Sequence, residues 1–98
     1  MSQPSDKKPA TLPEEASVRR DTKGKIVEIS FRNDKFFSVY EVGVRVRELV
    51  DQFHFLEKTA QSNTNQTTQK FLLDELKMLQ TWIKDLNRVY YYFKENSK

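Results

Sequence analysis

The sequence predicts a predominantly helical α+β fold, in which a short N-terminal β-hairpin precedes a long antiparallel helical hairpin. Apolar residues alternate with other residues over positions 26–31, as they do in a strand with one buried face. They recur every three or four positions over residues 38–59 and again over residues 67–95, which is the spacing of one helix face. A chain of 98 residues is long enough for a single domain.

Residues 1–17 are expected to form a disordered tail, and residues 18–98 are expected to form the folded domain. The tail contains all three prolines of the chain, charges of both signs and no aromatic residue. Such a composition cannot bury enough apolar surface to offset the conformational entropy that is lost on ordering.

The predicted β-hairpin joins residues 18–20 to residues 26–31, and a second turn is expected at residues 32–34. Asp21 and Gly24 fit the first and last positions of a type I turn. The apolar face of the second strand consists of Val27, Ile29 and Phe31. A two-stranded hairpin is marginally stable in water, so it must pack on a helix or pair with a second copy through its free edge. The sequence leaves both arrangements open.

Residues 36–42 can be interpreted as a strand or as the start of the first helix. Ser38 and Glu41 have the spacing of a capping box, which marks a helix N-terminus. Phe37 and Val42 have the spacing of a hydrophobic staple across the same terminus. These features favour the helix, while a strand followed by a later helix start remains the alternative.

Two apolar seams define the helices. The first contains Val39, Val42, Val46, Leu49, Phe53 and Leu56. The second contains Leu72, Leu76, Leu79, Ile83, Leu86, Tyr90 and Phe93. Gly43 is the least favourable residue of the first helix, since glycine costs up to about 1 kcal/mol in a helix interior. The polar stretch at residues 60–69 is a short connection, which makes the two helices antiparallel neighbours.

Both helices carry apolar side chains outside these seams, and a simple helical hairpin would leave them in water. Either the β-hairpin folds over one of these surfaces, or a second copy covers them in a four-helix arrangement. Large exposed apolar patches are uncommon on monomers, which favours the homodimer. Aromatic residues at the end of the chain add a second candidate contact surface, because Tyr and Trp are enriched at interfaces. The predicted protein interface consists of Val44, Phe55, Met78, Trp82, Val89, Tyr91 and Tyr92.

The sequence contains no pattern typical of an enzyme, a metal site or a cofactor site. There is no cysteine, and the single histidine, His54, cannot form a histidine cluster. Two glycines are too few for a phosphate-binding loop. Neighbouring carboxylates on the helices, such as Glu48 with Asp51 and Asp74 with Glu75, are typical of a solvated helix face. The expected function is therefore a non-catalytic protein–protein interaction module, acting as an adaptor, assembly factor or regulator.

A dimeric nucleic-acid-binding regulator is the alternative function. The net charge is +3, and basic residues are densest around the predicted β-hairpin, which could track phosphates. The candidate contacts are Arg19, Arg20, Lys23, Lys25, Arg32 and Lys35. A membrane-spanning segment is not expected, because no apolar run approaches the roughly 20 residues that cross a bilayer. Binding to a membrane surface is not expected either, because neither helix has the lysine-rich polar face that it requires. The first 17 residues lack the apolar core of a secretory signal, so a cytoplasmic (in a eukaryote, nuclear) location is expected.

Overall fold

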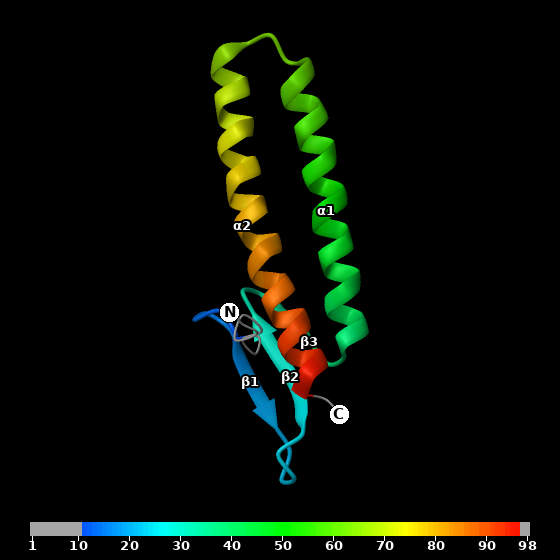
Figure 1. Ribbon diagram of the computed structural model, residues 1–98. Coiled ribbons are helices and arrows are strands. Elements are labelled where there is room, and N and C mark those ends of the chain that lie inside the picture. The colour runs from blue at the N-terminus through cyan, green and yellow to red at the C-terminus, as the bar shows by residue number, and fades with distance from the viewer. Residues whose placement is uncertain (1–10, 97–98) are drawn as a thin grey trace, which may run out of the picture.

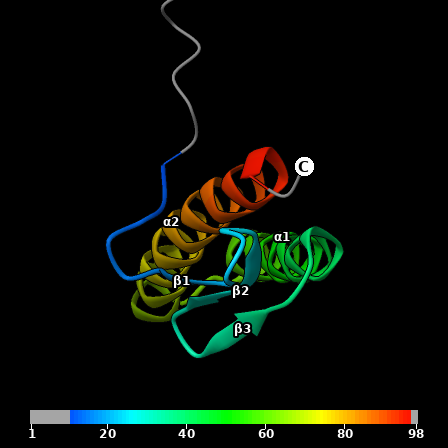
Figure 2. The ribbon, with the colours of Figure 1, turned by 90° about the horizontal axis from the view of Figure 1, so that it is seen from below.

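A computed structural model describes residues 11–96, which form three strands followed by two long helices (Figure 1). The elements are β1 (Ser17–Arg20), β2 (Ile26–Phe31), β3 (Asp34–Phe36), α1 (Val39–Ser62) and α2 (Gln66–Asn96). The strands make one antiparallel sheet in the order β1-β2-β3. The sheet lies against one end of the helical hairpin, as the view from below shows (Figure 2). The predicted α+β class, predominantly α, is confirmed.

The turn between β1 and β2 has the predicted location. The Asp21 carboxylate accepts hydrogen bonds from the amides of Lys23 and Lys25, both at 2.9 Å. The Gly24 amide donates to the Asp21 carbonyl at 3.0 Å, and Gly24 has a φ of 86°. This backbone region is easily reached by glycine alone, which explains why the turn ends there.

A β-bulge changes the predicted apolar face of β2. Arg19 pairs with Glu28, but the next residue, Arg20, pairs with Ile26, so one residue of β2 is unpaired. The extra residue turns Ile26 toward the core, where it is 4% exposed, while Val27 is half-buried. The prediction that Val27 shares the buried face with Ile29 and Phe31 is therefore wrong, because simple alternation does not hold across a bulge.

A third strand, β3, was not predicted. A two-residue loop, Arg32 and Asn33, reverses the chain so that β3 pairs with the end of β2. Phe36 in this strand is 4% exposed and belongs to the core. The strand interpretation of residues 36–42 is thus correct for Phe36 alone, and the helix interpretation holds from Val39 onward.

The N-terminus of α1 has the predicted cap at Ser38. The Ser38 hydroxyl accepts a hydrogen bond from the Glu41 amide at 3.2 Å. The Glu41 carboxylate accepts from the Phe37 amide at 2.7 Å, one residue before the Ser38 amide of a standard capping box. Phe37 is 56% exposed, so the predicted staple with Val42 does not bury its ring.

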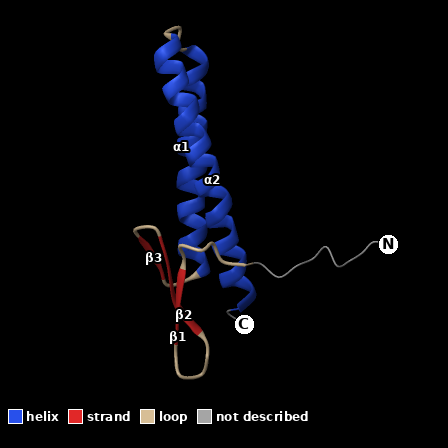
Figure 3. Cartoon of the chain, turned by 90° about the vertical axis from the view of Figure 1, so that its left-hand side faces the viewer, coloured by secondary structure: helices blue, strands red, loops and turns tan. Residues whose placement is uncertain are grey.

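The core lies where the sheet meets the helical hairpin, along the first part of α1 and the later part of α2. Its buried side chains come from the sheet and from both helices: Ile26, Ile29, Phe31 and Phe36 from the sheet, Val42 and Leu49 from α1, and Leu79, Leu86, Val89 and Phe93 from α2. The helices continue well beyond the sheet, as the side view shows (Figure 3). In that distal part, the only neighbour of each helix within residues 11–96 is the other helix.

Residues 11–16, which the sequence analysis assigned to a disordered tail, contact the folded domain. The Arg88 guanidinium on α2 donates to the carbonyl and hydroxyl of Thr11, both at 3.1 Å, and to the Leu12 carbonyl at 3.2 Å. Pro13 is buried, and Leu12 packs against the core. Ser17, the last residue of the predicted tail, is the first residue of β1, and residues 1–10 lie outside the described residues.

Replacing Gly43 by alanine is expected to raise the free energy of unfolding by about 0.5–1 kcal/mol, because alanine is the better helix former. A Cβ at this position would meet the Tyr90 ring at 3.5 Å, which is an ordinary contact. Urea denaturation followed by circular dichroism measures the change. Gly24→Ala is the contrasting variant, since its positive φ makes a Cβ unfavourable by about 1 kcal/mol. Destabilisation by Gly43→Ala would show that Tyr90 cannot adjust.

Candidate functional site: an apolar groove on the helical hairpin

An open groove with a volume of about 420 Å³ runs along the helical hairpin beside the β2–β3 loop. We call it the hairpin groove. Its apolar lining consists of Phe55, Leu56, Met78, Leu79 and Trp82. Its polar lining consists of Arg32, Gln52 and Glu75. Phe55 is 70% exposed and Met78 is 65% exposed, so the groove presents large apolar side chains to solvent.

Trp82 forms the wall of the groove nearest the sheet and lies beside two arginines. The Cζ atom of Arg32 is 4.9 Å from the centroid of its ring, and that of Arg45 is 5.2 Å away. Within residues 11–96, the indole N–H of Trp82 is buried without an acceptor. The cation–π contacts and packing therefore hold the ring, rather than a hydrogen bond.

Arg45 connects the β2–β3 loop to α1. Its guanidinium forms ion pairs at 3.1 Å with Asp34 of β3 and at 3.1 Å with Glu48 of α1. Burial lowers the pKa of Arg45, but the hydrogen bonds to Glu48 and Asp34 outweigh it and raise the pKa above its ordinary value. Arg45 therefore stays charged and fixes the loop that carries Arg32. Sequence reasoning missed Arg45, because its link to Asp34 depends on a strand without a periodic signal.

Arg32 occupies a backbone conformation that glycine would adopt at lower cost. It is the first residue of the two-residue loop and has a φ of 57°. The left-handed region costs a residue with a Cβ about 1–2 kcal/mol. Its guanidinium lies over both Trp82 and Phe31, the latter at 5.4 Å from the ring centroid. The arginine thus places a positive charge at the sheet end of the groove.

Three of the predicted interface residues come together in the hairpin groove, namely Phe55, Met78 and Trp82. Val89 does not belong to any surface, because it is fully buried. The sheet covers the part of α2 where Val89 lies, so apolar surface outside the seam is partly covered within one chain. Its assignment to an interface is therefore corrected.

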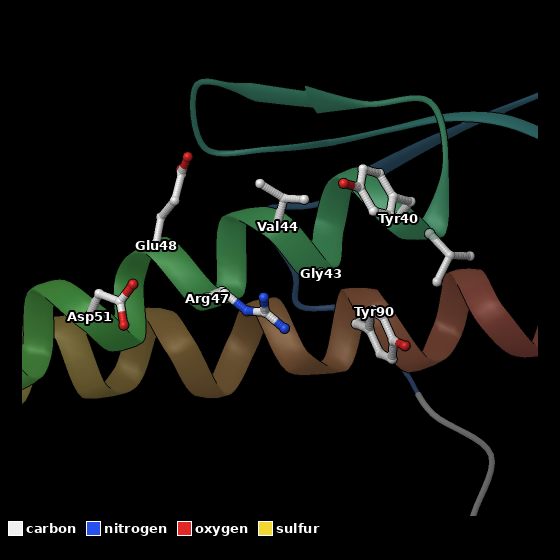
Figure 4. A pocket seen from close by; sticks show the side chains of 8 residues that line it. Tyr40, Gly43, Val44, Arg47, Glu48, Asp51 and Tyr90 are labelled. Atoms are coloured by element: carbon white, nitrogen blue, oxygen red, sulfur yellow. The ribbon is translucent and has the colours of Figure 1, made fainter.

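Val44 lies in a separate depression of about 380 Å³ on another side of α1 (Figure 4). Tyr40 and Gly43 of α1 and Tyr90 of α2 also line it, together with Arg47, Glu48 and Asp51. The absence of a side chain at Gly43 leaves space beside Tyr90. Charged groups form much of this lining, so the depression is less apolar than the hairpin groove.

The remaining predicted interface residues, Tyr91 and Tyr92, lie near the C-terminal end of α2. Tyr91 is 52% exposed and packs edge-on against Tyr90, with ring centroids 5.2 Å apart. The Tyr92 hydroxyl accepts a hydrogen bond from Arg20 of β1 at 3.0 Å. Tyr92 therefore ties the sheet to α2, whereas Tyr91 is accessible.

The six predicted nucleic-acid contacts are spread along the length of the sheet. Lys23 and Lys25 are in the β1–β2 turn, while Arg32 follows the other end of β2. A strand of six residues places these ends about 17–20 Å apart. Lys35 of β3 pairs with Ser30 and therefore lies near the Arg32 end of β2. The basic residues at the two ends of β2 are therefore separated by the length of the strand.

Two of these basic residues also have partners within the sheet. The Arg19 guanidinium donates to the Glu28 carboxylate at 2.8 and 3.0 Å, and the Glu28 side chain is 13% exposed. The hydrogen bond from Arg19 lowers the pKa of Glu28, with a smaller contribution from the Ser30 hydroxyl and against the opposing effect of burial. Arg20 donates to the Gly24 carbonyl at 2.7 Å as well as to Tyr92.

Residues 11–96 contain no group of three or more side chains arranged to bind a metal ion. Neither described helix has a stretch apolar enough to span a bilayer. His54 is exposed and lies 3.7 Å from the Glu57 carboxylate, one helical turn away.

Comparisons with protein families, with characterised proteins and with solved structures found no match for this chain. The chain is a three-stranded sheet on a helical hairpin with an open apolar groove.

Proposed function

We propose that the protein is a small non-catalytic interaction module that self-associates through the hairpin groove. Two helical hairpins would then form a dimer with a four-helix arrangement. The observation that carries this proposal is the gathering of Phe55, Met78 and Trp82 in one groove, with two of them more than half exposed. Exposed apolar surface of this kind marks protein contact sites on soluble domains.

The architecture explains why a second copy is the suitable cover. The sheet contributes to the core only near one end of the helices. Beyond it, each helix can bury only the face that meets its neighbour, because one partner helix covers a limited part of the circumference. A second hairpin laid on the groove would complete this part as a four-helix packing.

The remaining surfaces suit the role of adaptor, assembly factor or regulator. A dimer joined through the groove leaves the solvent side of the sheet and the exposed Tyr91 accessible in each copy. Tyrosine at such a position is a frequent anchor in protein contacts. We therefore place the contact with another protein at the aromatic end of α2.

Binding of nucleic acid through the β-hairpin is the alternative function, and the exposed Lys23 and Lys25 in the β1–β2 turn favour it. The internal bonds of Arg19 and Arg20 and the distant position of Arg32 count against it. Its distinguishing property would be an affinity for duplex DNA that falls steeply as the salt concentration rises.

Sedimentation equilibrium of the purified full chain tests the proposal. The wild type is expected to have the mass of two chains at micromolar concentration, and Phe55→Ser is expected to shift it toward one chain by removing an anchor from the groove. Tyr40→Ser is the matched control, because Tyr40 is a 78% exposed aromatic residue of the same helix outside the groove. A wild type that stays at the mass of one chain throughout the micromolar range would refute the proposed dimer.

A further inference from the structure

The hairpin groove carries a positive charge at one end and a negative charge toward the other. Arg32 lies at the sheet end, over Trp82. Glu75 precedes Trp82 by seven residues on α2, which is about two helical turns or about 10 Å toward the helix connection. Within the described residues, neither Arg32 nor Glu75 forms an ion pair. Each charge is therefore available to a molecule that occupies the groove.

The aromatic side chains of the groove are also divided between its two ends. The Gln69 side chain donates to the Ala60 carbonyl at 3.1 Å, which fixes the register of the antiparallel helices. Phe55 is five residues before Ala60 on α1, and position 74 is five residues after Gln69 on α2. Phe55 and Glu75 therefore lie at about the same level along the helical hairpin. Trp82 lies at the other end, beside Arg32. Met78 lies between these ends on α2 and lines the same groove.

Because of this order, the groove of one copy is complementary to the groove of a second copy that runs in the opposite direction. A two-fold axis through its middle, near Met78, would bring Arg32 against Glu75 of the partner. The same axis would bring Phe55 against Trp82 of the partner, so each aromatic residue of one copy would meet one of the other. A two-fold symmetric contact requires this kind of reciprocal pairing. With the hairpins parallel, Arg32 would instead meet Arg32 and Glu75 would meet Glu75.

We infer that two copies dock groove to groove with their helical hairpins antiparallel, and that Arg32 of each copy pairs with Glu75 of the other. The inference rests on the proposed self-association and adds the orientation of the partner and the residues that specify it. Opposite charges favour this orientation, and the repulsion of like charges disfavours the parallel one. It also gives a role to the arginine at position 32, whose φ of 57° suits glycine better.

Charge reversal at the two positions tests the orientation. Arg32→Glu makes both ends of the groove acidic, and Glu75→Arg makes both ends basic. If the dimer is antiparallel, each single variant is expected to have a dissociation constant at least about tenfold higher than that of the wild type. The double variant Arg32→Glu/Glu75→Arg exchanges the charges within one chain and is expected to dimerise again. Sedimentation equilibrium gives the dissociation constants.

Two further samples separate the groove contact from general effects of charge. Lys77→Glu changes the net charge as Arg32→Glu does, but Lys77 is an exposed residue of α2 outside the groove lining, so dimerisation is expected to be unchanged. An equimolar mixture of the two single variants is expected to form a heterodimer, since acidic groove ends then meet basic ones. If Arg32→Glu weakened association only by breaking the contact with Trp82 in its own chain, mixing it with Glu75→Arg would not restore dimerisation.

The outcomes distinguish this inference from the proposal beneath it. Single variants that dimerise as tightly as the wild type, or a double variant as weak as the single ones, would overturn the antiparallel pairing. The proposed dimer would then stand with another geometry, provided that Phe55→Ser still weakens it. A wild type with the mass of one chain would remove the dimer itself, and the inference with it.

Discussion

Phe31→Ala is expected to lower the free energy of unfolding by about 3–5 kcal/mol. Phe31 is 1% exposed and is the largest fully buried side chain among the residues that the structure describes. It ends β2, packs in the core between the sheet and the helices, and precedes the loop that carries Arg32. Its removal would leave a cavity at the junction of these layers.

Phe37→Ala is the matched control for this variant, because Phe37 is 56% exposed and lies six residues further along the chain. Its effect is expected to stay within about 0.5 kcal/mol. Urea denaturation is compared at one protein concentration at which all samples have the same oligomeric state, since association adds to the apparent stability. Equal effects of the two substitutions would mean that the sheet does not depend on the Phe31 contact with the helices.

The helices could be predicted because their signal is local and repeated. The seam positions recur over many turns, and the observed helices begin and end within about three residues of the predicted bounds. The second helix is longer than the first, 31 against 24 residues, as the predicted ranges 67–95 and 38–59 imply. The turn at Asp21–Gly24 could be predicted for a related reason, since both residues have a specific turn geometry.

The sheet was harder to predict, because its features depend on pairing between strands. β3 has three residues and no periodicity of its own, and the bulge that buries Ile26 appears only in the register with β1. The error at Val89 has the same origin. Apolar surface outside a helix seam can be covered by a sheet or by another molecule, and periodicity does not distinguish these covers.

The candidate site was predicted in its apolar part alone. Phe55, Met78 and Trp82 were identifiable because each lies outside a helix seam. Arg32 was assigned to nucleic acid, although the structure places it over Trp82, and Arg45 was not identified at all. Arg32 reaches the groove from the β2–β3 loop, and Arg45 of α1 lies over Trp82 and pairs with Asp34 of β3. Both contacts join the sheet region to the helices, so no spacing in the sequence reveals them.

Trp82→Ala is expected to raise the dissociation constant of the proposed dimer by about 30-fold, which corresponds to about 2 kcal/mol. Trp82 forms one end of the hairpin groove and provides the ring over which Arg32 and Arg45 lie. Without it, the surface offered to Phe55 of the partner is lost, and Arg32 loses the contact that directs it toward the groove. Sedimentation equilibrium measures the constant, and circular dichroism verifies that the variant retains its helices.

Tyr91→Ala is the matched control, since Tyr91 is an exposed aromatic residue of the same helix outside the groove. It is expected to leave the dissociation constant unchanged, because aromatic residues contribute strongly only where they fill the centre of a contact. If Tyr91→Ala separates the copies and Trp82→Ala does not, self-association takes place at the C-terminal end of α2. A second copy would then not occupy the hairpin groove, because a contact at the C-terminal end of α2 does not bring Phe55 of one copy against Trp82 of the other.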